Sequence, residues 1–186
     1  MREFKQALLV FVVLSLMTGF VYPLFITGLS QAFFSKKANG GLIVAGGKVV
    51  GSELIGQKFS NPRYFHGRPS ANDYDAGNSG GSNFGPANEK YIKEIAARIE
   101  KVRTENGLTP EQTVPADLVL ASASGLDPDI SLQSALLQTA RVAKARGMPA
   151  EKIADTVRLI AEPIYPGGLT RVNVLKLNLA LDHPKG

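Results

Sequence analysis

The hydrophobic pattern divides the chain into two parts of different character. No residue in the stretch Ala7–Phe34 carries a charge, and its first part, Ala7–Ile26, is apolar apart from a few small or weakly polar residues. A helix needs about 20 apolar residues to cross a bilayer. The pattern therefore predicts one transmembrane anchor over residues 1–36 and a single soluble domain over residues 37–186.

A cleaved secretory signal peptide is the competing interpretation of the same N-terminal stretch. Arg2 and Lys5 provide the positively charged start that signal peptides carry. However, the apolar stretch is longer than a usual signal-peptide core, and no clean A-x-A cleavage site follows it. These two features favour an anchor that is retained.

A proline interrupts the apolar stretch near its far end. The ring of Pro23 is expected to clash with the carbonyl of Gly19, four residues earlier. A helix kink is tolerated in a membrane where neighbouring groups satisfy the freed carbonyl. We therefore expect the helical geometry to be disturbed at this point.

The charges at the two ends of the anchor hardly discriminate between its two orientations. Arg2 and Lys5 precede the apolar stretch, and Lys36 and Lys37 follow it. We favour a cytoplasmic N-terminus, because a very short tail before a long trailing domain is the ordinary signal-anchor arrangement. The soluble domain then lies outside the cytoplasm.

Helical periodicity returns three times in the soluble part, with recognisable end signals. Asn88 and Ser131 are good N-cap residues, and Gly147 suits the position just after a helix. Apolar residues recur at three- and four-residue steps between these signals. The expected helices run from Asn88 to about Arg103, from Ser131 to about Arg146 and from Ala150 to about Ala161.

Strand signals are fewer and shorter. Leu42–Val44 and Val49–Val50 flank Gly46-Gly47, a pair typical of a two-residue hairpin turn. The tail Arg171–Asp182 fits either a strand, from its alternating leucines, or a short helix capped by Asn173. The predicted fold class is α/β (α+β), mostly helical with a small sheet, on one N-terminal transmembrane helix.

Composition excludes several classes of protein. The absence of cysteine excludes a disulfide framework, a cysteine zinc site and a thiol nucleophile. The formal charge is +5, but the soluble part is nearly balanced and has no basic run, so we expect no nucleic-acid binding. Asp73-x-Asp75 and Asp127-x-Asp129 lack the rest of a calcium-loop pattern, and we expect no metal site.

No catalytic motif occurs in the chain. The P-loop, the G-x-G-x-x-G fingerprint and the G-x-S-x-G elbow are all missing. His66 and His183 are the only two histidines, and no motif supports a hydrolase triad built on His66. We therefore expect no catalytic residues and no enzymatic activity of this chain alone.

A glycine-rich loop is the strongest candidate for binding a ligand. A run of small residues can turn several backbone N–H groups into one concavity that suits an anion or a phosphate. The same run can instead be a tight turn bonded to itself. The candidate residues are Ser79, Gly80, Gly81, Ser82 and Asn83.

Five sequence blocks, in order along nearly the whole chain, carry a resemblance to a known family. Together with the N-terminal anchor, they resemble the C subunit of the Kdp-type potassium-transporting ATPase. The blocks are YFHGRPS at 64–70, SGGSNxGP at 79–86, SGLDPxIS at 124–131, RVAxAR at 141–146 and RVNVLxLN at 171–178.

The resemblance implies a complex in the bacterial inner membrane with three partners: a potassium-carrier subunit, a P-type ATPase subunit and a very small membrane peptide. It implies that this chain is the accessory, non-catalytic member, which supports assembly and raises the nucleotide affinity of the ATPase subunit. Potassium is then carried by the complex and not by this chain, and no covalently bound cofactor is expected.

The resemblance also places a nucleotide contact at Gln138, in the helix before the Arg-Val-Ala block. ATP is cytoplasmic, whereas the favoured orientation puts Gln138 outside. We give precedence to the orientation, so that ATP acts through the partner subunit and Gln138 is a solvated or capping amide. A stand-alone, membrane-anchored or periplasmic protein that binds an anionic ligand in the glycine-rich loop is the alternative function.

Overall fold

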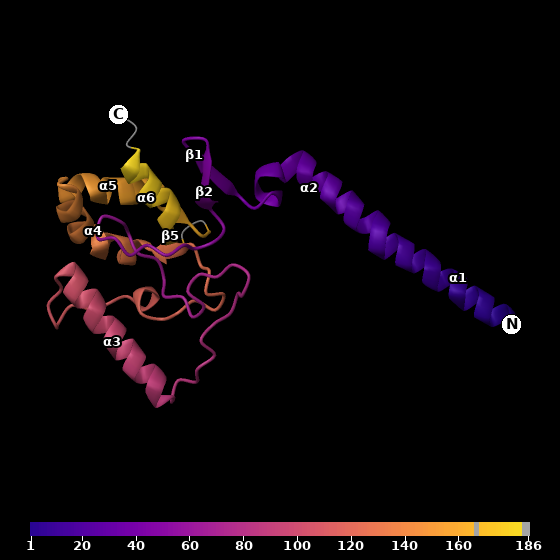
Figure 1. Cartoon of the computed structure of the whole chain (residues 1–186), viewed down its shortest axis with the longest axis horizontal. Coiled ribbons are helices and arrows are strands. Elements are labelled where there is room, and N and C mark those ends of the chain that lie inside the picture. The colour runs from indigo at the N-terminus through magenta and orange to yellow at the C-terminus, as the bar shows by residue number, and fades with distance from the viewer. Residues whose placement is uncertain (166–167, 184–186) are drawn as a thin grey trace. The chain divides into compact units, whose positions relative to one another are not determined.

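The computed structural model describes residues 1–165 and 168–183. The chain forms two compact units, the first over Met1–Leu42 and the second from Ile43 onward. In Figure 1 the first unit is indigo, and the second unit runs from purple through magenta and orange to yellow. Each unit is described by itself below.

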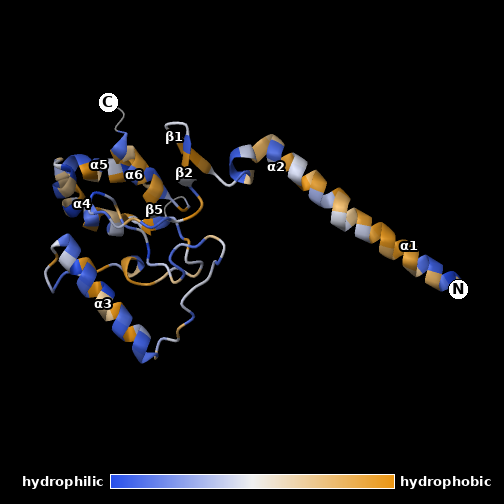
Figure 2. Ribbon diagram, in the orientation of Figure 1, coloured by the Kyte–Doolittle hydropathy of each residue, from blue (hydrophilic) through white to orange (hydrophobic). Residues whose placement is uncertain are grey.

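The first unit is a long apolar helix with a kink at Phe34, where the backbone leaves helical geometry (φ −135°, ψ 30°). Its parts are α1 (Arg2–Leu16), the π-helical segment η1 (Met17–Val21) and α2 (Tyr22–Ala38). Among the described residues, Arg2–Ala38 is the one helix that is long and apolar enough to cross a membrane. In Figure 2 orange, the colour of hydrophobic residues, predominates along this helix between its hydrophilic ends.

The expected disturbance at Pro23 takes the form of a wider helical turn. Pro23 is the second residue of α2 and lies inside the continuous helix, directly after the segment η1. The preceding segment η1 is π-helical, and the backbone N–H of Tyr22 donates to the carbonyl of Met17, five residues earlier. A π-turn is one of the known ways in which a long helix adapts to an internal proline.

The second unit is mostly helical with two small antiparallel sheets, which confirms the predicted fold class. The order of the strands in the larger sheet is β3-β5-β4, and β1 pairs with β2. The elements are β1 (Leu42–Ala45), β2 (Lys48–Ser52), α3 (Glu89–Asn106), the 3-10 turn η2 (Ala116–Leu118), β3 (Asp129–Ser131), α4 (Leu132–Arg146), α5 (Ala150–Ile160), β4 (Glu162–Pro163), β5 (Thr170–Asn173) and α6 (Val174–Asp182).

The predicted caps and turns are confirmed. The side chain of Asn88 accepts from the N–H of Tyr91 at the start of α3, and that of Ser131 accepts from Ser134 at the start of α4. Gly147 ends α4 with a φ of 66°, a left-handed conformation that favours glycine. Helix α3 is three residues longer than expected, because its stop signal is Gly107.

The ambiguous tail contains both of the structures that its pattern allowed. Strand β5 lies in the middle of the larger sheet, where Val172 is opposite Ile130 of β3. Asn173 then accepts a hydrogen bond from the N–H of Lys176 at 3.0 Å and caps α6. The alternating leucines fall within α6, which is helical. Most of its residues are buried, so apolar side chains occur around much of the helix and their spacing also fits a strand.

The core of the second unit lies between α4, α5, α6 and the larger sheet (Figure 1). Phe65 also belongs to it, although it comes from an irregular segment with no regular secondary structure. The buried cluster consists of Phe65, Ile130, Ala135, Val142, Ala143, Ile153, Val157, Val172, Val174, Leu177 and Leu181.

We expect the full chain to remain with the membrane after washing with carbonate and with high salt, because about 20 buried apolar residues hold it there. The test is immunoblotting of pellet and supernatant, with mass spectrometry to show that residues 1–36 are retained. A matched chain that lacks residues 1–35 should move to the soluble fraction. Extraction of the full chain by carbonate would show that the helix does not span the bilayer.

Candidate functional site

Two buried amides hold the irregular segment against the helices. The amide of Asn178, on α6, accepts from the N–H of Phe65 at 2.8 Å and donates to the carbonyl of the same residue at 3.0 Å. The amide of Gln138, on α4, pairs in the same two-bonded manner with His66, at 2.8 and 3.1 Å. Each amide thus supplies the donor and the acceptor that a neighbouring β-strand would provide.

Two arginines complete the contacts of this segment. Arg141, on α4, donates to the carbonyls of Pro62 and Tyr64 and to the amide oxygen of Gln138. Arg146, one turn further along α4, donates to the carbonyl of Arg63 and forms an ion pair with Asp182. The backbone from residue 62 to residue 66 is therefore bonded at nearly every position by side chains of α4 and α6.

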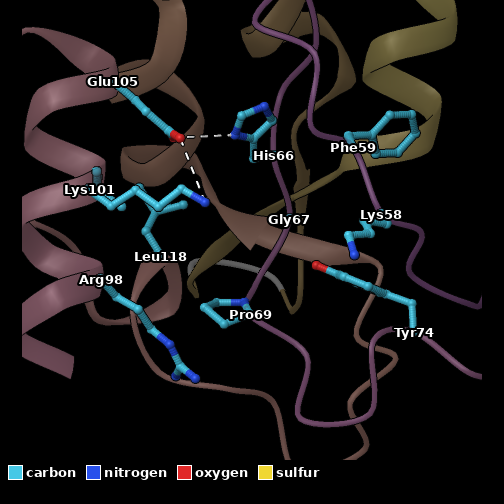
Figure 3. A pocket seen from close by; sticks show the side chains of 11 residues that line it. Lys58, Phe59, His66, Gly67, Pro69, Tyr74, Arg98, Lys101, Glu105 and Leu118 are labelled. Atoms are coloured by element: carbon cyan, nitrogen blue, oxygen red, sulfur yellow. Dashed lines mark ion pairs between the residues drawn. The ribbon is translucent and has the colours of Figure 1, made fainter. Parts of the chain in front are cut away.

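A cavity of about 230 Å³ lies beside this segment, between it and α3 (Figure 3). Its walls combine aromatic and apolar groups with three cationic side chains. The lining residues are Lys58, Phe59, His66, Gly67, Pro69, Tyr74, Arg98, Lys101, Val102, Glu105 and Leu118.

Glu105 is the acidic group of this cavity, and two basic groups share it. Its carboxylate lies 3.7 Å from Nδ1 of His66 and 3.8 Å from Nζ of Lys101, as the dashed lines in Figure 3 show. The other ring nitrogen of His66, Nε2, lies 3.3 Å from the carbonyl oxygen of Asn61. Burial lowers the pKa of His66, and the nearby charge of Arg141 lowers it further.

The glycine-rich loop makes its contacts elsewhere in the domain. The N–H of Gly80 donates to the carbonyl of Ser124 at 2.9 Å, and the hydroxyl of Ser79 donates to the same oxygen at 3.0 Å. A Cβ added at Gly81 would lie 3.0 Å from the carbonyl oxygen of Ala123. The loop is thus packed against residues 123–125, and the N–H of Gly80 is already used in that contact.

Asn83, at the end of the loop, has a positive φ of 53°, and Ser82 beside it is half-buried. The loop and Gln138 bond to different parts of the domain, since Gln138 pairs with His66, Ser134 and Arg141. Binding of a ligand at these two places stays a prediction from sequence.

The expectation that Gln138 is a solvated or capping amide is wrong. Its side chain is 2% exposed, and both the oxygen and the nitrogen of its amide bond to groups within the domain. Only the tertiary contact with a segment 72 residues away reveals this use of the side chain. The contacts of Asn178, Arg141 and Glu105 are likewise not predicted from the sequence. Arg141 and Asn178 stand in two of the family blocks, but the blocks do not indicate what these side chains bond to.

The acidic pairs act in turns and ion pairs. The carboxylate of Asp127 accepts from the N–H of Asp129 at 3.0 Å and pairs with Arg68 at 2.9 Å. Asp75 accepts from the N–H of Gly77. In the parts of the chain that the structure describes, no three His, Asp or Glu side chains gather as metal ligands would.

We expect Gln138→Ala to lower the free energy of unfolding by about 3 kcal/mol, because the buried N–H and carbonyl of His66 lose their partner. The measurement is urea unfolding followed by circular dichroism. Gln133→Ala is the matched control, since Gln133 lies on the same helix with an exposed side chain. An equal, small effect of both substitutions would mean that the amide pairing contributes little.

The lowered pKa of His66 predicts a pH dependence of stability. The folded domain binds its proton less readily than the unfolded chain, whose histidine has the ordinary pKa of 6.5. The resulting stability is fully present above that pKa and is lost as the pH falls through the lowered folded value. We expect His66→Gln to reduce the stability difference between about pH 7.5 and about pH 5, as measured by urea unfolding.

His183 offers the control for this experiment, because it is the only other histidine in the chain. His183→Gln should leave the wild-type pH dependence in place. If His66→Gln left it in place as well, the carboxylates and not His66 would be responsible.

Comparison with known proteins agrees with the resemblance noted in the sequence. Residues 4–183 match the sequence model of the family described as KdpC, K+-transporting ATPase, c chain. A potassium-transporting ATPase KdpC subunit from Gemmatimonas aurantiaca is 51% identical over 98% of this chain and 93% of the relative. The KdpC subunit of Geobacter sulfurreducens is 48% identical over 98% of each chain. These matches show that the chain belongs to the KdpC family, the c chains of K+-transporting ATPases.

Proposed function

We propose that this chain is the accessory, non-catalytic subunit of an ATP-driven potassium uptake complex and that it acts only through contacts with its partners. Membership of the KdpC family makes it a subunit of such a complex. The proposed partners are a potassium-carrier subunit, a P-type ATPase subunit and a small membrane peptide. The proposed roles are to support their assembly and to raise the nucleotide affinity of the ATPase subunit.

The bonding of Gln138 is the observation that carries this proposal. Its amide accepts from the N–H of His66 and from Arg141, and it donates to the carbonyls of His66 and Ser134. An amide has two donor hydrogens and two acceptor sites, so these four contacts use all of its capacity. A nucleotide would have to displace contacts that hold the core together. An effect on nucleotide affinity through the ATPase subunit requires no such loss of hydrogen bonds in this chain.

The single apolar helix supports membrane anchoring. We propose that its N-terminus is cytoplasmic and that the second unit lies outside the cytoplasm. This orientation separates the unit from cytoplasmic ATP and agrees with an indirect effect on nucleotide binding. It also leaves the ATPase subunit as the place where ATP binds.

The anchor itself offers no route for an ion, because ion pathways need polar or ionisable groups at depth and Ala7–Phe34 has no charge. The chain can then change transport only by binding one state of its partners better than another. The small residues Ser15, Thr18 and Gly19 of the anchor helix allow a helix of a partner subunit to approach closely. Thr18 directs its hydroxyl to the carbonyl of Leu14, at 2.7 Å, within its own helix.

The alternative, a stand-alone protein that binds an anion in the glycine-rich loop, gains no support from the loop's contacts. The N–H of Gly80 and the hydroxyl of Ser79 both point to the carbonyl of Ser124. The loop thus resembles a structural turn that ties two irregular segments together.

We expect removal of this chain from the purified complex to raise the KM for ATP by about fivefold or more, the usual size of a coupling between separate sites. Photoaffinity labelling with an azido-ATP should mark the ATPase subunit and leave this chain unlabelled. Addition of the purified chain should restore the lower KM. Labelling of this chain that is competed by ATP would contradict the indirect mechanism, and an unchanged KM would contradict the role in nucleotide affinity.

A further inference from the structure

The β1–β2 hairpin has apolar side chains on both of its faces. Ile43 and Val50 are half-buried, on the face that packs inward. On the other face, Leu42 is 53% exposed, and Val44 and Val49 are each 61% exposed. An antiparallel pair with one face packed on a core normally alternates apolar inward and polar outward residues. The outward positions here therefore require a different explanation.

The geometry of the hairpin brings these side chains together. Gly46 and Gly47 have φ values of 58° and 77°, as a two-residue type I′ turn demands. Such a turn places Val44 opposite Val49, with Leu42 two residues along the same face. Clustered exposed apolar side chains mark a surface that interacts with something other than water.

The position of the hairpin in the chain limits what can cover this face. The apolar helix ends at Ala38 and β1 begins at Leu42. Four residue steps of extended chain span at most about 14 Å. The connection is also tightened by hydrogen bonds from the N–H groups of Gly40 and Gly41 to the carbonyls of Lys37 and Lys36. The start of the hairpin is therefore held close to the end of the membrane helix.

The charges of this region favour phospholipid over an arbitrary surface. No acidic residue occurs between Glu3 and Glu53, whereas Lys37 and Lys48 lie on either side of β1. Lysines next to a membrane helix are attracted to the phosphate groups of lipids. An apolar face with a lysine before β1 and another at the start of β2 matches the boundary between headgroups and acyl chains.

We propose that the outward face of the hairpin, formed by Leu42, Val44 and Val49, rests in this boundary of the lipid bilayer, with Lys48 near the phosphates. The hairpin is then a second membrane contact, beside the transmembrane helix. This inference goes beyond the proposed role in the complex, and it holds for either orientation of the anchor.

The chain contains no tryptophan, so a single introduced tryptophan reports its own surroundings. We would reconstitute the full-length variants Val44→Trp and Val49→Trp in nanodiscs whose phospholipids carry brominated acyl chains, which quench indole fluorescence on contact. Leu159→Trp is the matched control, because Leu159 lies on α5 and is 82% exposed. Two hairpin positions are used so that the test still holds if one substitution disturbs the fold. Circular dichroism verifies that each variant is folded.

The expected result is a blue-shifted emission that loses more than half of its intensity at positions 44 and 49, with emission at 159 typical of water and hardly quenched. The experiment is repeated on the chain copurified with its partner subunits, where the same result is expected. Unquenched emission at both hairpin positions would overturn the proposal. So would quenching that disappears in the complex, because a partner protein and not lipid would then cover the face.

Discussion

A backbone segment that crosses a protein core without strand partners must find its hydrogen bonds elsewhere. In this domain the segment around Phe65 and His66 finds them in two side-chain amides, Asn178 and Gln138, which approach from different helices. Both amides are almost completely buried, at 1% and 2% exposure. Neither would be tolerated there unless its own polar atoms were also satisfied, so the segment and the amides require each other.

This pairing links parts of the chain that are far apart in sequence. Through it, α4 and α6 are joined to a segment that precedes both of them, and Phe65 becomes a member of the main core. Arg141 extends the link to α3, where its Nε donates to the side chain of Asn106. The cavity that contains Glu105 and Lys101 depends on this link, because α3 forms one of its walls and the segment around His66 forms the other (Figure 3).

The same interaction has a consequence for the proposed role in binding partner subunits. A surface formed by irregular backbone keeps one shape only if buried contacts hold it, and a binding surface gains affinity when it is ordered before it binds. Hydrogen bonds within the domain fix both irregular regions, the segment around Phe65 and His66 and the glycine-rich loop. The loop uses Ser124 where the segment uses Gln138 and Asn178. The unit therefore presents a surface of irregular backbone that hydrogen bonds within the domain hold in place.

The sequence by itself determined the features that depend on neighbours along the chain. Length and hydropathy identified the helix that is able to span a membrane, and local chemistry located the caps at Asn88 and Ser131 and the turn at Gly46. The order of five short blocks identified the family. The tertiary structure decided what depends on distant contacts: that Asp182 and Arg146 meet, that the tail is a strand and then a helix, and that Gln138 is buried. Burial and pairing across more than a hundred residues, as between Phe65 and Asn178, leave no periodic signal, because each partner alone looks like an ordinary polar or apolar residue of its own element.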